Sequence, residues 1–291
     1  MGAYLSQPIT DLVAEDGRSS KLVYGSAAMQ GWRVSQEDAH IAIEEFDKST
    51  DTSLFAVFDG HGGPEVAQYC AQHLPNFIKS LASYQNTNIV ESLEEAFLKF
   101  DNTLTKPEDE EEDEDEESSD DDMDDEDSGL LVQSSGGYEE PGRDSGCTAV
   151  VALLRGNDLY VANAGDSRCV VSRNGKAIEM SIDHKPEDEI ERTRVEKAGG
   201  KVTPDGRVNG GLNLSRAIGD HAYKDNTNVS DREQMITALP DIKTLSLEIP
   251  NDKFMVIACD GIWNSLTSQQ VVDFVGERID KVQKLSTICD E

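Results

Sequence analysis

The chain has 291 residues, with 26 Lys and Arg against 58 Asp and Glu, so its formal net charge is −32. Hydrophobic residues make up 37% of it, which is too many for a wholly disordered chain, and the length allows one large domain or two small ones. The charge argues against direct nucleic-acid binding, because a polyanion repels phosphate backbones.

The N-terminus carries a candidate lipidation motif. Met1 to Ser6 fit the M-G-x-x-x-[ST] pattern for N-myristoylation on Gly2, although a pattern this short also matches by chance. One myristoyl chain binds membranes only weakly, and anionic lipid repels the acidic chain. We therefore expect weak membrane association and no stable insertion, and no run of about 18 apolar residues predicts a transmembrane helix.

Cysteine usage predicts an intracellular protein. The five cysteines are widely spaced and form no C-x-x-C pair, which is typical of reduced and mostly buried thiols. The N-terminus also lacks the apolar region of a secretory signal. The sequence leaves both the nucleus and the cytoplasm open as locations.

The first hundred residues predict a leader, a strand and two helices. Residues 1–24 lack periodicity and are expected to form an N-terminal leader. Residues 54–58 are an apolar run of strand length that ends in Asp-Gly-His-Gly-Gly. Apolar residues at helical spacing predict helices over residues 64–82 and 89–104, and a proline suits the first turn of the former.

Residues 105–143 predict a disordered acidic insertion. Residues 108–127 alone contain 17 Asp and Glu, so this segment cannot bury enough apolar area to offset its ordering entropy. The simplest interpretation is a solvated loop. Alternatives are a docking arm for basic proteins such as histones or splicing factors, and autoinhibition at a cluster of cations. Ser118 and Ser119 each have an acid three residues later, which suits phosphorylation by an acid-directed kinase.

The pattern from Gly146 onward is rich in strands. Short strands are predicted over 148–154, 158–162, 168–172 and 254–259, with helices over 186–198 and 269–279, the last capped by Ser268. This mixture of hairpins and helix pairs predicts an α+β fold rather than alternating parallel units.

Apolar strands in this chain repeatedly end in a carboxylate. Asp59, Asp166 and Asp260 each follow such a strand, and Asp220 follows a turn. A single Asp-Gly pair is most often only a turn. Repeated at neighbouring strand ends, however, such acids come close together and need a counter-cation. Hard divalent cations such as Mg²⁺ and Mn²⁺ prefer these oxygen ligands.

Two basic side chains accompany these acids. His61 comes two residues after Asp59, where an imidazole can protonate a leaving-group oxygen. Arg33 lies four and five residues before Glu37 and Asp38, and its guanidinium fork suits phosphate oxygens. Taken alone, an arginine in this setting is more often part of an ordinary surface ion pair.

Five segments together resemble the metal-dependent Ser/Thr protein phosphatases of type 2C. The segments occur in that family's order. They contain Arg33-x-x-x-Glu37-Asp38, Asp59-Gly60-His61, Asn163–Arg168, Ser215–Asp220 and Ala258–Trp263. The N-terminal hexapeptide and the acidic insertion are most like the gamma type of this family. The resemblance implies an α+β catalytic domain over residues 25–291, interrupted by residues 105–143, in which two packed antiparallel sheets are flanked by helix pairs.

The resemblance also implies a metal site and a mechanism. Two Mn²⁺ or Mg²⁺ ions would activate a water that attacks phosphorus, with a weaker third ion near Asp166. Arg33 would bind the substrate phosphate, and His61 would act as general acid. The implied metal-binding residues are Asp59, the Gly60 carbonyl and Asp260, with Glu37 and Asp38 holding metal-bound waters.

The chain departs from the family pattern in two places. Asn264 stands where many relatives have Asp, and no late Asp-Asn motif follows Trp263. We therefore expect the catalytic domain to be incomplete at its C-terminal end and its metal site to have one carboxylate fewer.

The predicted function is hydrolysis of phosphoserine and phosphothreonine in proteins. The alternative is a catalytically impaired, histone-chaperone-like acidic binding module on a phosphatase scaffold. A small-molecule phosphomonoesterase would use the same metal chemistry and stays open. The intact Arg33, Asp59 and His61 favour the enzyme, because a scaffold that only binds has no physical need for them.

Overall fold

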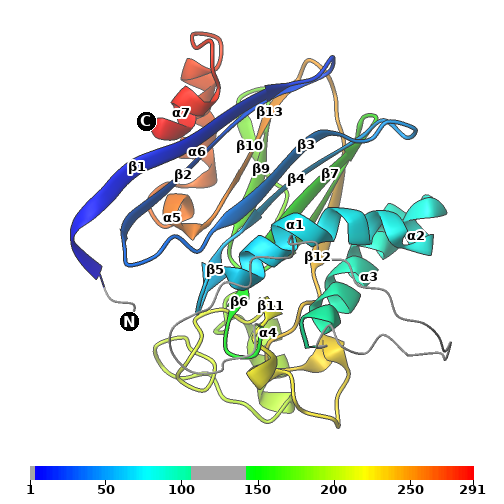
Figure 1. Cartoon of the computed structure of the whole chain (residues 1–291), viewed down its shortest axis with the longest axis vertical. Coiled ribbons are helices and arrows are strands. Elements are labelled where there is room, and N and C mark those ends of the chain that lie inside the picture. The colour runs from blue at the N-terminus through cyan, green and yellow to red at the C-terminus, as the bar shows by residue number, and fades with distance from the viewer. Residues whose placement is uncertain (1–3, 106–141) are drawn as a thin grey trace, which may run out of the picture.

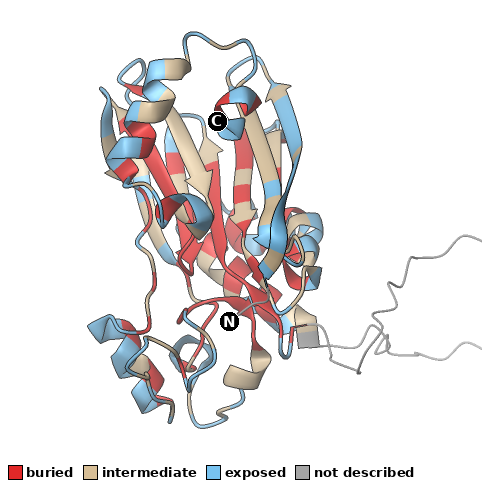
Figure 2. Cartoon of the chain, turned by 90° about the vertical axis from the view of Figure 1, so that its left-hand side faces the viewer, coloured by how far each residue is buried: buried red, intermediate tan, exposed pale blue. Residues whose placement is uncertain are grey.

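The computed structural model describes residues 4–105 and 142–291. Its described part contains two antiparallel sheets packed face to face, with helices covering both outer faces (Figure 1). The α+β sandwich that the sequence predicts is therefore confirmed. Buried residues concentrate in the strands and on the helix faces that meet them (Figure 2).

The larger sheet has five strands in the order β12-β8-β7-β4-β3. Its central strand, β7, sorts apolar side chains to both faces, because successive residues of a strand point to opposite sides. Ala149, Val151 and Leu153 belong to the core beneath the helices, whereas Val150 and Ala152 belong to the core between the sheets. The strands are β3 (Ala39–Asp47), β4 (Thr52–Phe58), β7 (Ala149–Arg155), β8 (Asp158–Ala164) and β12 (Asp241–Ser246).

The smaller sheet has the order β10-β9-β13 and comprises β9 (Arg168–Arg173), β10 (Lys176–Glu179) and β13 (Asp252–Ala258). Its outer face is covered by α5 (Asp260–Trp263) and α6 (Ser268–Arg278). The N-cap of α6 is Thr267, one residue before the expected Ser268, and Thr267 forms a capping box with Gln270.

Three helices cover the other face of the larger sheet. Pro64 occupies the N-cap position of the first of them, and the apolar stripes of the first and third pack into the core beneath the larger sheet. Both helices predicted in this region are confirmed. The elements are α1 (Glu65–Ser80), α2 (Ala82–Gln85) and α3 (Ile89–Asp101), followed by the short 3-10 helix η1 (Asn102–Thr105).

The expected N-terminal leader forms a strand from residue 4 onward. Strand β1 (Tyr4–Arg18) pairs antiparallel with β2 (Val23–Arg33), and the short helix α7 (Ser286–Asp290) lies against this hairpin. Asp16 fixes that contact, since it accepts hydrogen bonds from the backbone and hydroxyl of Ser286. Most β1 side chains are exposed, so the strand carries no alternating apolar pattern that the sequence could reveal.

A smaller lobe sits at the end of the sandwich where the acidic strand ends meet. Its three short strands are ordered β11-β6-β5, namely β5 (Gly60–His61), β6 (Gly146–Cys147) and β11 (Ile218–Gly219). Around them lie α4 (Glu189–Lys197) and the 3-10 helices η2 (His221–Tyr223) and η3 (Asp231–Glu233).

A buried ion-pair network joins this lobe to the larger sheet. Glu191 of α4 accepts hydrogen bonds from Arg194, Ser215 and Arg216, and Arg216 also pairs with Asp241 of β12. Although burial opposes its charged form, hydrogen bonding to Arg216 and the charge of Arg194 lower the pKa of Glu191 to about 2. The network is therefore fully ionised at neutral pH.

The described chain resumes at Gly142, inside the predicted insertion over 105–143. The carbonyls of Gly142 and Arg143, the last two residues of that segment, accept hydrogen bonds from the His221 and Ala222 amides, so the small lobe includes the end of the predicted insertion. Among the described residues, no helix is long and apolar enough to cross a membrane.

Candidate active site

The pairing of β3 with β4 brings the first two acids together. Ala39 lies opposite Phe58, so Asp38, which precedes β3, and Asp59, which follows β4, meet at one end of the sheet. Thr148 fixes the backbone of Asp59, because the Thr148 amide donates a hydrogen bond to the Asp59 carbonyl at 2.9 Å. The strand register, rather than loop flexibility, therefore fixes this pair of carboxylates.

A compact acidic cluster forms at this point. One ligand atom from each of Asp38, Asp59 and Cys259 lies within 4.8 Å of the others. Burial, followed by the charges of Asp38, Asp260 and Asp166, raises the pKa of Asp59 to about 8. Burial likewise raises the pKa of Asp38. At neutral pH the metal-free cluster therefore retains a proton that free carboxylic acids would lose.

The cluster fits a hard divalent cation. Neighbouring carboxylates in a poorly solvated site repel one another, so they cannot all be ionised. A cation that binds their oxygen atoms stabilises the ionised forms. Cys259 is the less suitable member, because burial and the charges of Asp38 and Asp59 raise the pKa of its thiol to about 12. Its position beside Asp38, at 3.8 Å from Oδ2, was not predicted from the sequence, which presents it only as an apolar strand residue.

Asp260, Glu37 and Gly60 lie around the same cluster. The charge of Asp260 acts on both Asp38 and Asp59, while its Oδ2 accepts a hydrogen bond from Asn264 Nδ2 at 2.9 Å. Asn264 thus orients the Asp260 carboxylate. Gly60 has no room for a side chain, since a Cβ would collide with the backbone carbonyl oxygen of Glu37.

His61 forms a close pair with Asp220. Its Nε2 lies 2.9 Å and 2.8 Å from the two Asp220 carboxylate oxygens. Burial opposes the imidazolium, but the charge and hydrogen bonding of Asp220 outweigh it and raise the pKa of His61. His61 is therefore poised to hold a proton beside the cluster.

The small three-stranded sheet explains how His61 and Asp220 meet. His61 and Gly219 both pair with Gly146, and a Cβ at Gly146 would lie only 2.5 Å from Asp220 Oδ2. The sequence placed Asp220 in a motif but assigned it no role. In the sequence, Asp220 is marked only as an acid that follows the Gly219 turn. Its contact with His61 joins residues far apart in the chain, so spacing alone cannot predict it.

Arg33 is free to bind an anion. Its side chain is exposed at the end of β2, and within residues 4–105 and 142–291 its guanidinium makes no ion pair or hydrogen bond. The alternative interpretation, an ordinary surface ion pair, has no support from the described residues.

Asp166 is buried and already paired with a basic side chain. Lys185 Nζ lies 2.6 Å from Asp166 Oδ2. The sequence suggested Asp166 as a ligand for a third cation, but in this structure an ammonium group neutralises it.

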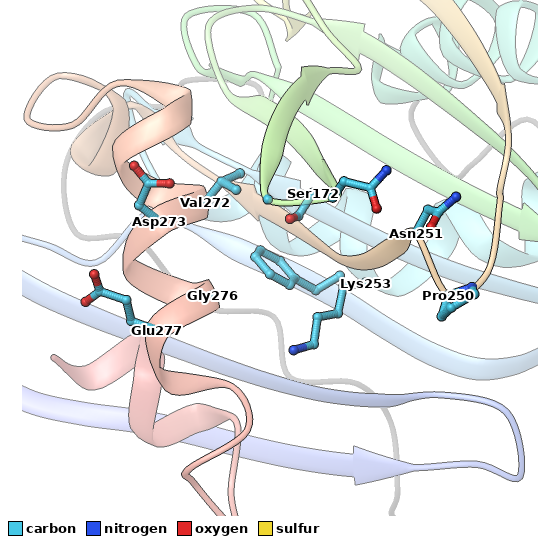
Figure 3. Close-up of a pocket in the computed structure, with 11 residues that line it drawn as sticks. Ser172, Pro250, Asn251, Lys253, Val272, Asp273, Gly276 and Glu277 are labelled. Carbon is cyan, nitrogen blue, oxygen red and sulfur yellow. The ribbon is translucent and has the colours of Figure 1, made fainter.

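A pocket of about 570 Å³ lies elsewhere, between α6 and the turns that flank β9 and β13 (Figure 3). None of its lining residues belongs to the acidic cluster, so it is not the centre that the strand-end carboxylates form. They are Ser172, Asn174, Gly175, Pro250, Asn251, Lys253, Phe254, Val272, Asp273, Gly276 and Glu277.

Three predicted modification sites lie outside the described residues. They are Gly2, the candidate myristoylation site, and Ser118 and Ser119, the candidate phosphorylation sites.

Comparison with known proteins places this site in a family. The family model described as protein phosphatase 2C matches residues 22–291. The chain belongs to the protein phosphatase 2C family. It is 43% identical over 307 residues to "Probable protein phosphatase 2C 60" of Arabidopsis thaliana, covering 100% of this chain and 85% of the relative.

Further relatives of this phosphatase 2C chain agree. "Protein phosphatase 1G" of Homo sapiens is 35% identical over 481 residues, covering 100% of this chain and 88% of that protein, which fits the likeness to the gamma type. A crystal structure of serine-threonine phosphatase 2C from Toxoplasma gondii matches with a TM-score of 0.67 at 16% identity, covering 98% of this chain and 90% of that one.

Membership establishes the class of reaction. The chain is a Ser/Thr protein phosphatase, a hydrolase that acts on phosphoprotein substrates and depends on Mg²⁺ or Mn²⁺. The acidic cluster supplies the residues that fit such cations.

Replacing Asp59 by Asn should stabilise the metal-free chain. The folded-state pKa of Asp59, about 8, lies above the ordinary aspartate value of 3.8, so ionisation of Asp59 costs stability increasingly as pH rises between these values. We expect Asp59→Asn to raise the free energy of unfolding by on the order of 1–3 kcal/mol near pH 8, and by less near pH 5. Urea denaturation in EDTA at both pH values measures this.

Asp47→Asn is the matched control. Hydrogen bonding to Ser49 lowers the pKa of Asp47 to about 2, so its amide should not stabilise the chain near pH 8. A loss of stability in Asp59→Asn near pH 8 would show that the cluster is not strained by its own charge.

Proposed function

We propose that this phosphatase hydrolyses phosphoserine and phosphothreonine with two divalent cations held at the strand-end cluster. Asp59, the Gly60 carbonyl and Asp260 would hold the ions directly, and Glu37 and Asp38 would hold their waters. The observation that carries the proposal is the meeting of Asp38 and Asp59, which are half-buried together and have no basic partner among the described residues. When bound, such cations supply an activated water nucleophile and neutralise charge on the phosphoryl oxygens.

The protein's own side chains would complete the reaction. Arg33, exposed and unpaired within the described chain, would bind and orient the phosphate oxygens. His61 would give its proton to the leaving seryl or threonyl oxygen. Asp220 would hold the imidazole ring in place and favour its protonated form.

The alternative is an impaired acidic binding module on the same scaffold. The paired His61 and Asp220 argue against it, because binding alone gives no reason to bury a carboxylate against an imidazole beside an acidic cluster. Catalytic turnover distinguishes the two functions directly.

Removal of the cations should abolish turnover. Phosphate release from a phosphothreonine peptide should occur with Mn²⁺ or Mg²⁺, cease in EDTA and return when the ion is restored. Asp59→Asn should lower kcat by at least about a hundredfold, because a carboxylate that would hold the cations is lost. Circular dichroism would confirm that the variant is folded.

Turnover that persists in EDTA would refute a metal-dependent site. A folded wild-type chain without turnover in either metal, but with tight binding of basic proteins, would establish the binding module instead.

Asp220 should matter most for poor leaving groups. A p-nitrophenolate leaves without protonation, whereas a seryl oxygen needs the proton that His61 supplies. Asp220→Asn should therefore reduce kcat on a phosphoserine peptide by about 10–100-fold and on p-nitrophenyl phosphate far less. The basic limb of its pH–rate profile should move to lower pH, because the loss of the Asp220 charge lowers the pKa of His61.

Asp225→Asn, on the exposed surface after η2, is the matched control and should leave both substrates unaffected. Equal losses on the two substrates would mean that Asp220 supports the fold or the metal site rather than proton transfer to the leaving group.

We further propose that the acidic insertion docks basic phosphoproteins, such as histones or splicing factors. The support is compositional, because 17 carboxylates within residues 108–127 would attract a cationic partner over long range. Phosphorylation at Ser118 and Ser119 would add charge to the same arm. Myristoylation at Gly2 would give weak membrane association.

Deleting residues 106–141 should discriminate between substrates by charge. The deletion preserves Gly142, whose carbonyl bonds to His221. We expect kcat/KM to fall about tenfold on a Lys/Arg-rich phosphopeptide at low salt, with p-nitrophenyl phosphate unchanged. A chain whose insertion keeps its length but carries Asn and Gln in place of the acids should behave like the deletion. Equal losses on both substrates would exclude docking.

A further inference from the structure

Lys185 is placed against Asp166 by the backbone rather than by chance. The two loops that carry them are joined by reciprocal hydrogen bonds, from the His184 amide to the Gly165 carbonyl at 3.0 Å and from the Gly165 amide to His184 Nδ1 at 3.1 Å. Asn163 Nδ2 adds bonds to the carbonyls of Gly165 and Ile182. The ammonium group therefore projects from a fixed support.

The contact itself is strong and largely shielded from water. Lys185 Nζ lies 2.6 Å from Asp166 Oδ2, and the Asp166 side chain is only 5% exposed. Removing one partner of a buried ion pair leaves an uncompensated charge, which is far costlier than removal at the surface. Loss of the Lys185 charge would therefore leave Asp166 as a buried carboxylate without its counter-charge.

Other carboxylates surround the same ammonium group. Burial opposes its charge, but Asp166 and then Asp183 and Asp260 outweigh burial and raise the pKa of Lys185. Asp183 is already bound by both ends of the Arg168 guanidinium. Among the described residues, Lys185 is the only basic side chain paired with Asp166.

We propose that the Lys185 ammonium is a resident counter-cation that competes with a divalent ion for Asp166. The inference rests on the proposed metal site and concerns only its outer position. A divalent ion that binds Asp166 must displace Nζ, so any such site would be weakened because the protein fills it with its own charge. The Lys185 side chain is 33% exposed, which leaves the displaced ammonium access to water.

The test is Mn²⁺ binding, measured by the electron paramagnetic resonance of free Mn²⁺ and by calorimetry on the full chain. Lys185→Gln removes the charge but keeps an amide donor for the buried carboxylate. We expect the weakest class of Mn²⁺ sites to tighten about tenfold in this variant, as loss of a competing charge predicts. Lys185→Arg should keep that class weak, and Asp166→Asn should abolish it.

Lys201→Met is the matched control, because it removes one exposed positive charge that forms no ion pair among the described residues. An unchanged weak class in Lys185→Gln, or equal tightening in Lys201→Met, would overturn the proposal. Absence of any Mn²⁺ binding would instead refute the proposed metal site, so the two failures are distinguishable.

A measurement on the wild-type chain does not depend on the variants folding. Anomalous diffraction from crystals in high Mn²⁺ should show an ion on Asp166 with Lys185 Nζ moved out of hydrogen-bond reach. An ion on Asp166 with the ammonium still in contact would overturn the proposal.

Discussion

The burial of several carboxylates at one end of a β-sandwich is the constraint on which the rest of this structure depends. The register of β3 against β4 forces Asp38 and Asp59 together, and β13 delivers Cys259 and Asp260 to the same place. Folding without a cation therefore leaves like charges in a poorly solvated site, where at least one must keep its proton. A bound divalent ion would neutralise this repulsion. It would thereby stabilise the contact between strand ends that are far apart in the sequence.

The basic groups near the cluster are divided in a way that explains its chemistry. His61 is paired with Asp220, and Lys185 is paired with Asp166. Each of these charges is therefore neutralised by a neighbouring side chain. Asp38 and Asp59 receive no basic partner within the described chain, which leaves them for divalent ions. Arg33 is exposed and unpaired there, and so is available to the substrate. In the proposed mechanism, metal binding, proton donation and phosphate binding would thus fall to different side chains.

The sequence predicted those features that local patterns carry. Apolar strands ending in acids indicated Asp59 and Asp260, and helical spacing indicated α1 and α3. It failed where the decisive contact is long-range or backbone-driven. The exposed strand β1 has no alternation to detect, and the partners of His61 and Asp166 lie 159 and 19 residues away. Cys259 reads as an ordinary strand residue until the fold places it beside Asp38.

The most direct test of the central claim is the number of protons released when Mn²⁺ binds. Because the pKa of Asp59 is raised to about 8, the metal-free cluster holds a proton at neutral pH that a cation must displace. Calorimetric titrations in buffers of different ionisation enthalpy count such protons. We expect release of about one proton per chain near pH 7, and fewer near pH 9. Mn²⁺ binding without proton release near pH 7 would contradict it.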